Sequence, residues 1–306
     1  GLEQDGLDRI YTQLQASLLA TGVTEVRLTA DSTPLAAEPV PVRSTRVSTS
    51  PLVLTAEGFG FLSGDDLTAI EGLSAAMTQV DAAAVQVAPD RDAAAVSTTG
   101  GEVVRVDAAG DVLVVDDRAG LIDPSIDPHG YVWSVPREDP SGLIATGADG
   151  VAVTVADAFP DSTEIAALAV SRDGTRVAAV LSVNGRLGIQ VAGIVRDTDG
   201  VPLRLADPFS LGSVSGAGLS LAWLDDTTVA ALTRSGTDVT LVEQAVGGPG
   251  ASVTAPSGTV SVAGANTDAT VRLRSEDGLL FVRRATNWEQ TAADILVLAT
   301  QQGSPS

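Results

Sequence analysis

Short apolar runs that end at Asp, Gly, Ser or Asn recur along most of the chain, from about Leu52 onward. This pattern is typical of short strands joined by tight turns. Five stretches share one frame, in which an apolar strand leads through a polar turn into a second apolar strand: residues 87–96, 125–133, 169–178, 222–230 and 262–271. The sequence therefore predicts an all-β repeat protein.

The spacing of the repeats indicates the architecture. If Asp90, His129, Asp173, Asp225 and Ala265 are equivalent turn positions, successive repeats are 39, 44, 52 and 40 residues apart. Propeller blades of four strands have a period of about 40 to 50 residues. Their sheets pack face to face, so the abundant Ala and Val side chains suit close contacts between sheets. We expect a β-propeller.

One further unit is incomplete at its start. Residues 52–70 contain three strand-like runs but no convincing first strand, and the apolar run at residues 295–299 can supply it. Pairing the two ends of the chain in this way closes the ring and protects an edge that would otherwise invite aggregation. Six blades is the count that the sequence favours, with five and seven as the alternatives.

The first 40 residues differ from the repeats. Apolar side chains at three- and four-residue spacing predict a helix that ends near Gly22: Leu7, Ile10, Tyr11, Leu14 and Leu18. Alternation over residues 25–30 then predicts a short strand. One helix and one strand cannot close a core, so we interpret residues 1–40 as an α/β tail of a preceding domain, or an adaptor, and residues 41–306 as the propeller. The start at Gly1 reads as a processing or cloning boundary.

Charge narrows the classes of partner. The formal net charge is −21, so nucleic acid and anionic membrane surfaces would be repelled over most of the surface. All 18 basic residues are Arg, a bias that GC-rich codon usage explains. The chain has no Cys, which excludes disulfides, thiolate metal sites and a cysteine nucleophile. No run approaches the roughly 20 apolar residues of a membrane-spanning helix.

The sequence offers no catalytic or metal-binding constellation. His129 is the only histidine, and it occupies a turn position where a polar residue is expected on structural grounds. Three pairs of adjacent acids also lie at predicted turns, so we interpret them as solvated turn residues: Asp65 with Asp66, Asp116 with Asp117, and Asp225 with Asp226. Nucleophile-elbow, phosphate-loop and zinc-protease motifs do not occur. We predict no enzyme activity, no cofactor, no metal and no catalytic residue.

The longest repeat step contains residues 191–205, where an outer hairpin is predicted to turn at Asp199 and Gly200. Loops on a rigid scaffold often carry recognition. We therefore take four polar residues of this hairpin as candidate partner-binding residues, against the alternative of a merely longer hairpin: Arg196, Asp197, Asp199 and Arg204.

Three segments in this order resemble the LpqB lipoproteins of actinobacteria: A-V-S-R-D-G-T-R-V-A at residues 169–178, V-A-G-I-V-R-D-T-D-G-V-P-L-R-L at 191–205, and G-L-S-L-A-W-L-D-D-T-T-V-A-A-L at 218–232. The N-terminal helix with G-V-T-E-V-R-L is similar to the end of a GerMN-type domain. Truncation would explain why the lipid-anchor cysteine and most of the GerMN-type domain are missing from this sequence. The resemblance implies a protein anchored by lipid outside the cytoplasmic membrane.

The resemblance also implies a role in signal transduction. It suggests binding to the extracellular domain of a membrane sensor histidine kinase similar to MtrB, modulation of an MtrA/MtrB two-component system, and effects on cell envelope and division. Two alternatives remain open from the residues. One is a propeller hydrolase or lyase acting on cell-wall glycan or peptide, which would need carboxylates gathered in one open channel about 5 to 10 Å apart. The other is a structural scaffold for the adjoining domain.

Overall fold

The computed structural model describes residues 3–19, 21–40, 45–264, 266, 270–285 and 287–303. The chain forms two compact units, Gly1–Arg43 and Ser44–Ser306. The sequence places the boundary between residues 40 and 41. Each unit is described by itself.

The first unit consists of α1 (Gln4–Leu19) and a hairpin of β1 (Thr29–Ala30) and β2 (Thr33–Pro34). The predicted helix is confirmed, and Gly22 follows it with a positive φ of 87°. Asp8 accepts a hydrogen bond from the backbone amide of Glu38 at 2.9 Å, which ties the helix to the segment after the hairpin. The apolar stripe of α1 stays accessible to solvent, because none of its side chains is buried.

The second unit is a propeller whose described strands form six blades. Blade 1 contains β27 (Val297–Gln301), β3 (Leu52–Thr55), β4 (Gly58–Ser63) and β5 (Asp66–Ala69). Blade 2 contains β6 (Ala82–Val87), β7 (Ala93–Thr98), β8 (Val103–Asp107) and β9 (Val112–Asp116). Blade 3 contains β10 (Ser125–Ile126), β11 (Val132–Ser134), β12 (Ile144–Thr146) and β13 (Ala152–Thr154).

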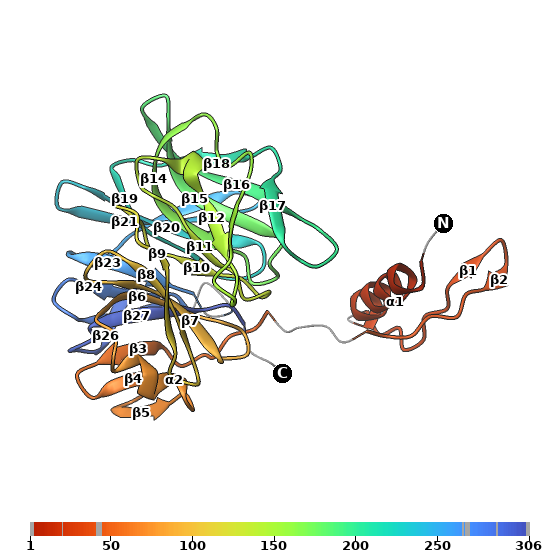
Figure 1. Cartoon of the computed structure of the whole chain (residues 1–306), viewed down its shortest axis with the longest axis horizontal. Helices are drawn as coiled ribbons and strands as arrows, with labels where there is room; N and C mark the ends of the chain where they lie inside the picture. Colours follow the sequence, from red (N-terminus) through yellow and green to blue (C-terminus); the bar gives the residue numbers. More distant parts are fainter. Residues whose placement is uncertain are drawn as a thin grey trace. The chain divides into compact units, whose positions relative to one another are not determined.

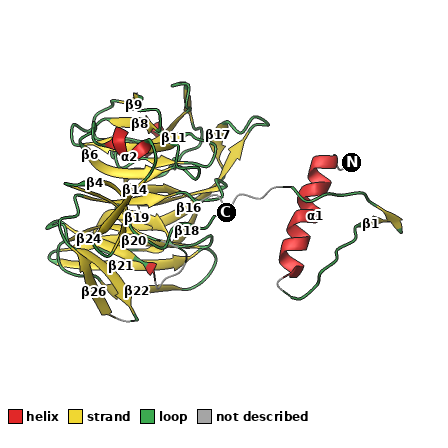
Figure 2. Cartoon of the chain, turned by 90° about the horizontal axis from the view of Figure 1, so that it is seen from below, coloured by secondary structure: helices red, strands yellow, loops and turns green. Residues whose placement is uncertain are grey.

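Blade 4 has an additional strand and contains β14 (Ser162–Val170), β15 (Arg176–Val183), β16 (Arg186–Arg196), β17 (Pro202–Leu205) and β18 (Phe209–Ser213). Blade 5 contains β19 (Ala217–Trp223), β20 (Thr228–Ser235), β21 (Asp238–Ala245) and β22 (Gly250–Thr254). Blade 6 contains β23 (Thr259–Ala263), β24 (Arg272–Ser275), β25 (Leu280–Arg284) and β26 (Asn287–Ala292). A short helix, α2 (Leu73–Met77), and a 3-10 turn, η1 (Pro140–Gly142), complete the described elements of this unit, which strands dominate (Figure 2).

The two ends of the propeller sequence close the ring. The C-terminal strand β27 pairs antiparallel with β3, where Leu298 opposes Val53, and pairs parallel with β6, where Thr300 opposes Gln86. Figure 1 shows β27, in blue, between β3 and β6. The predicted closure by residues 295–299 and the favoured count of six blades are both confirmed.

Small residues fill the contacts between blades. Ala94, Ala178 and Ala230 lie on the second strands of blades 2, 4 and 5 and have no exposed surface. A larger side chain occupies the second strand of blade 3, where Trp133 is completely buried. Face-to-face sheet packing therefore accounts for the Ala-rich composition.

The repeated turn positions lie between the first and second strands of their blades. Asp225 accepts hydrogen bonds from the backbone amides of Thr227 and Thr228 at 2.7 and 2.8 Å. Asp173 accepts the amide of Thr175 at 3.1 Å in the same manner. Such bonds satisfy backbone donors in a tight turn, which explains why the repeats retain a short polar residue there. Ala265, the fifth predicted position, lies outside the described residues.

One interpretation of the acid pairs is wrong. Asp116 is not a solvated turn residue, because only 6% of its surface is exposed. It forms an ion pair with Arg118 at 2.7 Å and accepts a hydrogen bond from the hydroxyl of Ser134 at 2.5 Å. Burial alone would raise the pKa of Asp116, but the bonds from Arg118 and Ser134 outweigh it and lower the pKa.

Ring closure is testable by truncation. A chain that ends at Asp294 lacks β27 and leaves the inner edges of β3 and β6 unpaired, so we expect it to lose cooperative unfolding and to aggregate. Near-ultraviolet circular dichroism and size-exclusion chromatography would measure this. A chain that ends at Gly303 keeps β27 and is the matched control. A cooperative transition in the shorter chain would contradict the closure mechanism.

Candidate functional site

The predicted outer hairpin arises because β16 is long enough to pair with two strands. Its first half pairs with β18, where Val191 opposes Phe209, and its second half pairs with β17, where Val195 opposes Arg204. The hairpin of residues 194–205 is thus an insertion between the third strand of blade 4 and its outer strand β18. β17 lies at the edge of the propeller in both views (Figure 1 and Figure 2).

The hairpin attaches to the neighbouring blade as well as to its own. Ala156, which follows the last strand of blade 3, accepts a hydrogen bond from the amide of Leu205 at 2.9 Å and donates one to the carbonyl of Leu203 at 3.0 Å. These bonds form one isolated parallel bridge between the end of blade 3 and β17 of blade 4. The hairpin is therefore held by backbone contacts along two blades.

An interior ion pair reinforces this attachment. The guanidinium of Arg196 lies 2.7 Å from the carboxylate of Asp127 in blade 3, which is completely buried. Asp127 also accepts hydrogen bonds from the indole of Trp133 at 2.9 Å and from the backbone amide of Tyr131 at 3.0 Å. Arg196 donates further to the carbonyls of Gly174 and Gly200 at 3.2 and 2.9 Å. The ion pair therefore connects Tyr131 and Trp133 of blade 3 with the turns at Gly174 and Gly200 of blade 4.

The four candidate binding residues divide into two kinds. Arg196 has 11% of its side chain exposed and takes part in the attachment between blades. Asp197 is exposed, but its carboxylate accepts the amides of Asp199 and Val201 at 2.9 Å and shapes the turn. Asp199 and Arg204 are exposed, and Arg204 donates a hydrogen bond to the carbonyl of Leu205 at 3.3 Å.

His129 lies against the turn of the hairpin. A Cβ atom placed on Gly200 would come within 2.9 Å of the His129 ring, and the φ of Gly200 is +83°, so glycine is required there on both counts. This packing agrees with the interpretation of His129 as a structural turn residue. In the described part of the chain, no group of three or more His, Asp or Glu side chains is placed to hold a metal ion.

Acidic side chains surround Tyr131 beside this turn. Burial raises the pKa of the Tyr131 phenol, and the negative charges of Asp127, Asp149 and Asp197 raise it further, while Arg196 opposes them. The exposed carboxylates of Asp149 and Asp197 therefore act together on one spot of the surface. No sequence pattern indicates this grouping, because Asp149 lies in a turn of blade 3 and Asp197 in a turn of blade 4.

Turn geometry gathers other acids at the same end of the propeller. Strands alternate in direction within a blade, so the turns after its first and third strands lie at one end. The innermost strands β27 and β6 run parallel, which sets that end in common for adjacent blades. We call the exposed carboxylates of these turns the acidic turn face: Asp65, Asp90, Asp92, Asp111, Asp149, Asp173, Asp197, Asp199 and Asp226.

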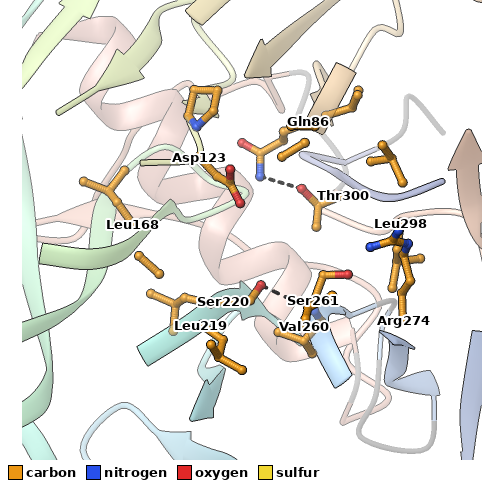
Figure 3. Close-up of a pocket in the computed structure, with 18 of the residues that line it drawn as sticks. Gln86, Asp123, Leu168, Leu219, Ser220, Val260, Ser261, Arg274, Leu298 and Thr300 are labelled. Atoms are coloured by element: carbon orange, nitrogen blue, oxygen red, sulfur yellow. Dashed lines mark hydrogen bonds between the residues drawn. The ribbon is translucent and has the colours of Figure 1, made fainter. Parts of the chain in front are cut away.

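A cavity of about 230 Å³ lies on the axis of the ring, among the innermost strands. Its wall includes Ala84, Ala167, Leu219, Val260 and Leu298, from five different blades. Figure 3 shows the polar groups on the wall. Of the described residues that line the cavity, Asp123 is the one with a carboxylate.

The end of the channel near the acidic turn face is filled by the C-terminal segment. Gln302 is 1% exposed and donates to Gln86 at 3.0 Å and to the carbonyl of Val170 at 3.1 Å. Gln86 in turn accepts the hydroxyl of Ser125 at 2.6 Å. This polar network joins blades 2, 3 and 4 to the strand that closes the ring, and it blocks the axis at that end.

The model of the lipoprotein LpqB β-propeller domain matches residues 54–296. The chain belongs to this family. The match covers all six blades of the LpqB-type propeller in whole or in part, and it confirms the resemblance drawn from the repeat and hairpin segments. A comparison with curated protein sequences gave no match.

The comparison with solved structures found matches of low sequence identity to this LpqB-type propeller. TolB from Acinetobacter baumannii has a TM-score of 0.55 and 15% identity, covering 80% of this chain and 64% of that chain. A functionally unknown protein from Desulfotomaculum acetoxidans has a TM-score of 0.48 and 14% identity, covering 72% and 74%. The chain spans less than two thirds of TolB, and the likeness to TolB shows the fold alone.

The interior ion pair is testable by substitution. Arg196→Met leaves the buried carboxylate of Asp127 without its cation, so we expect the free energy of unfolding in urea to fall by about 3 to 5 kcal/mol. Arg204→Met, on the exposed part of the same hairpin, is the matched control. It should change the free energy of unfolding by less than about 0.5 kcal/mol. Equal effects of the two substitutions would show that the pair does not hold the hairpin.

The effect of the negative charges around Tyr131 is testable by titrating its phenol. In a Tyr11→Phe background, Tyr131 is the remaining tyrosine, and its ionisation can be followed by ultraviolet absorbance. Asp149→Asn or Asp197→Asn removes one negative charge, so each should lower the pKa of Tyr131. Asp238→Asn, at a turn on the other end of the propeller, should leave it unchanged. If the pKa of Tyr131 is the same in all three variants, Asp149 and Asp197 do not act together on Tyr131.

Proposed function

We propose that this LpqB-type propeller is a non-enzymatic binding module of an extracytoplasmic lipoprotein. Its partner would be the extracellular domain of an MtrB-like sensor histidine kinase, whose signalling through an MtrA/MtrB-type system it would modulate, with effects on cell envelope and division. Family membership supports the lipoprotein assignment. The described residues contain no helix long and apolar enough to cross a membrane. Membrane attachment in the full-length protein would come from a lipid anchor that precedes this sequence.

One observation carries the proposal of a binding surface: the hairpin is fixed at its base and exposed at its tip. Backbone bonds to Ala156 and the ion pair of Arg196 hold the base, whereas Asp199 extends into solvent. A loop that is already ordered loses little conformational freedom when it binds, so more of the contact energy contributes to affinity. A merely decorative hairpin would not need a buried charge pair at its base.

The charge of the surface indicates the chemistry of the partner. Asp149, Asp197 and Asp199 lie on the acidic turn face, in a chain with a net charge of −21. Complementary charge accelerates association and specifies orientation, although exposed pairs add little to affinity one at a time. We therefore expect a basic patch on the kinase domain, and binding that weakens as salt increases.

The cavity does not favour the alternative of a hydrolase or lyase. Glycoside hydrolysis uses two carboxyl groups that face one substrate. Asp123 is the one carboxylate among the described residues of the cavity wall. The proposal of a binding module therefore accounts for more of the observed arrangement.

Calorimetry with the purified extracellular domain of the cognate kinase would test the proposal. Asp199→Arg reverses a charge on the acidic turn face, and we expect it to weaken binding by about tenfold, mainly through slower association. Asp238→Arg introduces the same change at an exposed turn on the other end and is the matched control. A substitution is preferable to deletion of the hairpin, because deletion would also remove the attachment to blade 3.

Each outcome bears on a different part of the proposal. Equal binding by the two variants would place the contact surface away from the hairpin and overturn the proposed site. No binding by the unchanged chain would overturn the proposed partner for this part of the protein and favour the structural scaffold.

A further inference from the structure

The cavity on the axis carries two opposite charges that lie apart from each other. Asp123 precedes the first strand of blade 3, and Arg274 lies on β24 of blade 6, which is opposite blade 3 in a ring of six. Figure 3 shows Asp123 beside Gln86 and Arg274 beside Leu298, both at the wall of the cavity. No ion pair joins the two among the described residues.

Arg274 is placed unlike the arginines that form ion pairs in this chain. Its Nε donates to the carbonyl of Ile295 at 2.7 Å, and in the described structure no carboxylate lies within ion-pair distance of its guanidinium. Burial lowers the pKa of Arg274, and no acidic neighbour opposes this effect. A partly buried cation without an anion reduces stability, so the terminal nitrogens of Arg274 are suited to an anion that enters from outside.

Asp123 provides the opposite charge at the accessible end of the same cavity. Part of the Asp123 surface is exposed, while its carboxylate lies among the wall residues and accepts a hydrogen bond from the hydroxyl of Ser97 at 3.1 Å. Its enclosure by the wall raises its pKa, while the bond from Ser97 and the charge of Arg137 partly oppose this. The described residues place no cation within ion-pair distance of it. A ligand with a cationic group would supply the missing partner.

The rest of the wall limits the size and polarity of the ligand. Leu168, Leu219 and Leu298 provide apolar surface on the wall, and in the described structure the hydroxyl of Ser261 has no hydrogen-bond partner. A cavity of about 230 Å³ is smaller than the roughly 300 to 1,000 Å³ of drug-sized ligand sites. Gln302 blocks the far end, so a ligand must enter on the side of Asp123.

We propose that this cavity binds a small zwitterion, of the class of amino acids and dipeptides, with its carboxylate at Arg274 and its ammonium group at Asp123. The inference does not depend on the proposed kinase partner. It assigns the channel a ligand, whereas the partner surface lies on the turns at the other end.

Three forms of one dipeptide would test this by calorimetry or nuclear magnetic resonance titration of the whole chain. Alanyl-alanine carries both charges, N-acetyl-alanyl-alanine lacks the ammonium group, and alanyl-alanine amide lacks the carboxylate. We expect alanyl-alanine to bind and either blocked form to bind about 10- to 100-fold more weakly, as expected for the loss of charged hydrogen bonds. These comparisons need no variant, so they remain valid if a substitution impairs folding.

Substitutions then locate the two ends of the ligand. Arg274→Gln should weaken the binding of alanyl-alanine but leave the binding of alanyl-alanine amide unchanged. Asp123→Asn should weaken the binding of alanyl-alanine but leave the binding of N-acetyl-alanyl-alanine unchanged. Arg284→Gln, at an exposed position of the same blade, is the matched control. Absence of alanyl-alanine binding up to about 10 mM, a concentration at which even weak binding is detectable, would overturn the proposal. Equal binding of all three forms would overturn it as well.

Discussion

The propeller depends on the pairing of its last strand with its first ones. β27 lies between β3 and β6, so segments about as far apart as the propeller sequence allows meet in one sheet. The entropic cost of closing so large a loop grows only slowly with its length, and the gain is that neither inner edge remains unpaired. Gln302 extends this closure onto the axis, where its amide joins Gln86 and Val170. The same few residues thus close the ring and block one end of its channel.

Closure also determines what each end of the propeller can do. Because β27 and β6 run parallel, turns after first and third strands meet at one end, where Asp residues cap the turns and remain largely exposed. The hairpin of blade 4 joins this end and is attached to blade 3 through Arg196 and Asp127. The cavity opens at the other end, beside Asp123. Partner binding and ligand binding are therefore proposed for separate ends of one rigid scaffold.

The local features of the fold were predictable, whereas contacts between blades were not. Repeat spacing and turn residues depend on neighbouring positions, so they indicated the propeller, its closing strand and the structural role of Asp225. From the sequence, Arg196 is a candidate partner-binding residue, but the acid that it pairs with, Asp127, lies 69 residues away along the chain. Asp116 likewise meets Ser134 from the next blade. The rotation between adjacent blades determines such pairs, and no sequence pattern encodes that rotation directly.

The distribution of arginine connects the fold to the surface charge. Arg172 is buried and donates to the carbonyl of Trp223 at 2.9 Å, and burial lowers its pKa to about 10. Arg196 and Arg283 pair with the acids Asp127 and Glu243 in the interior or near it. Cations used in this way cannot neutralise exposed carboxylates, so the acidic turns keep their charge. Arg274 also points inward, but in the described structure no carboxylate lies within ion-pair distance of its guanidinium, and the proposed ligand would supply one.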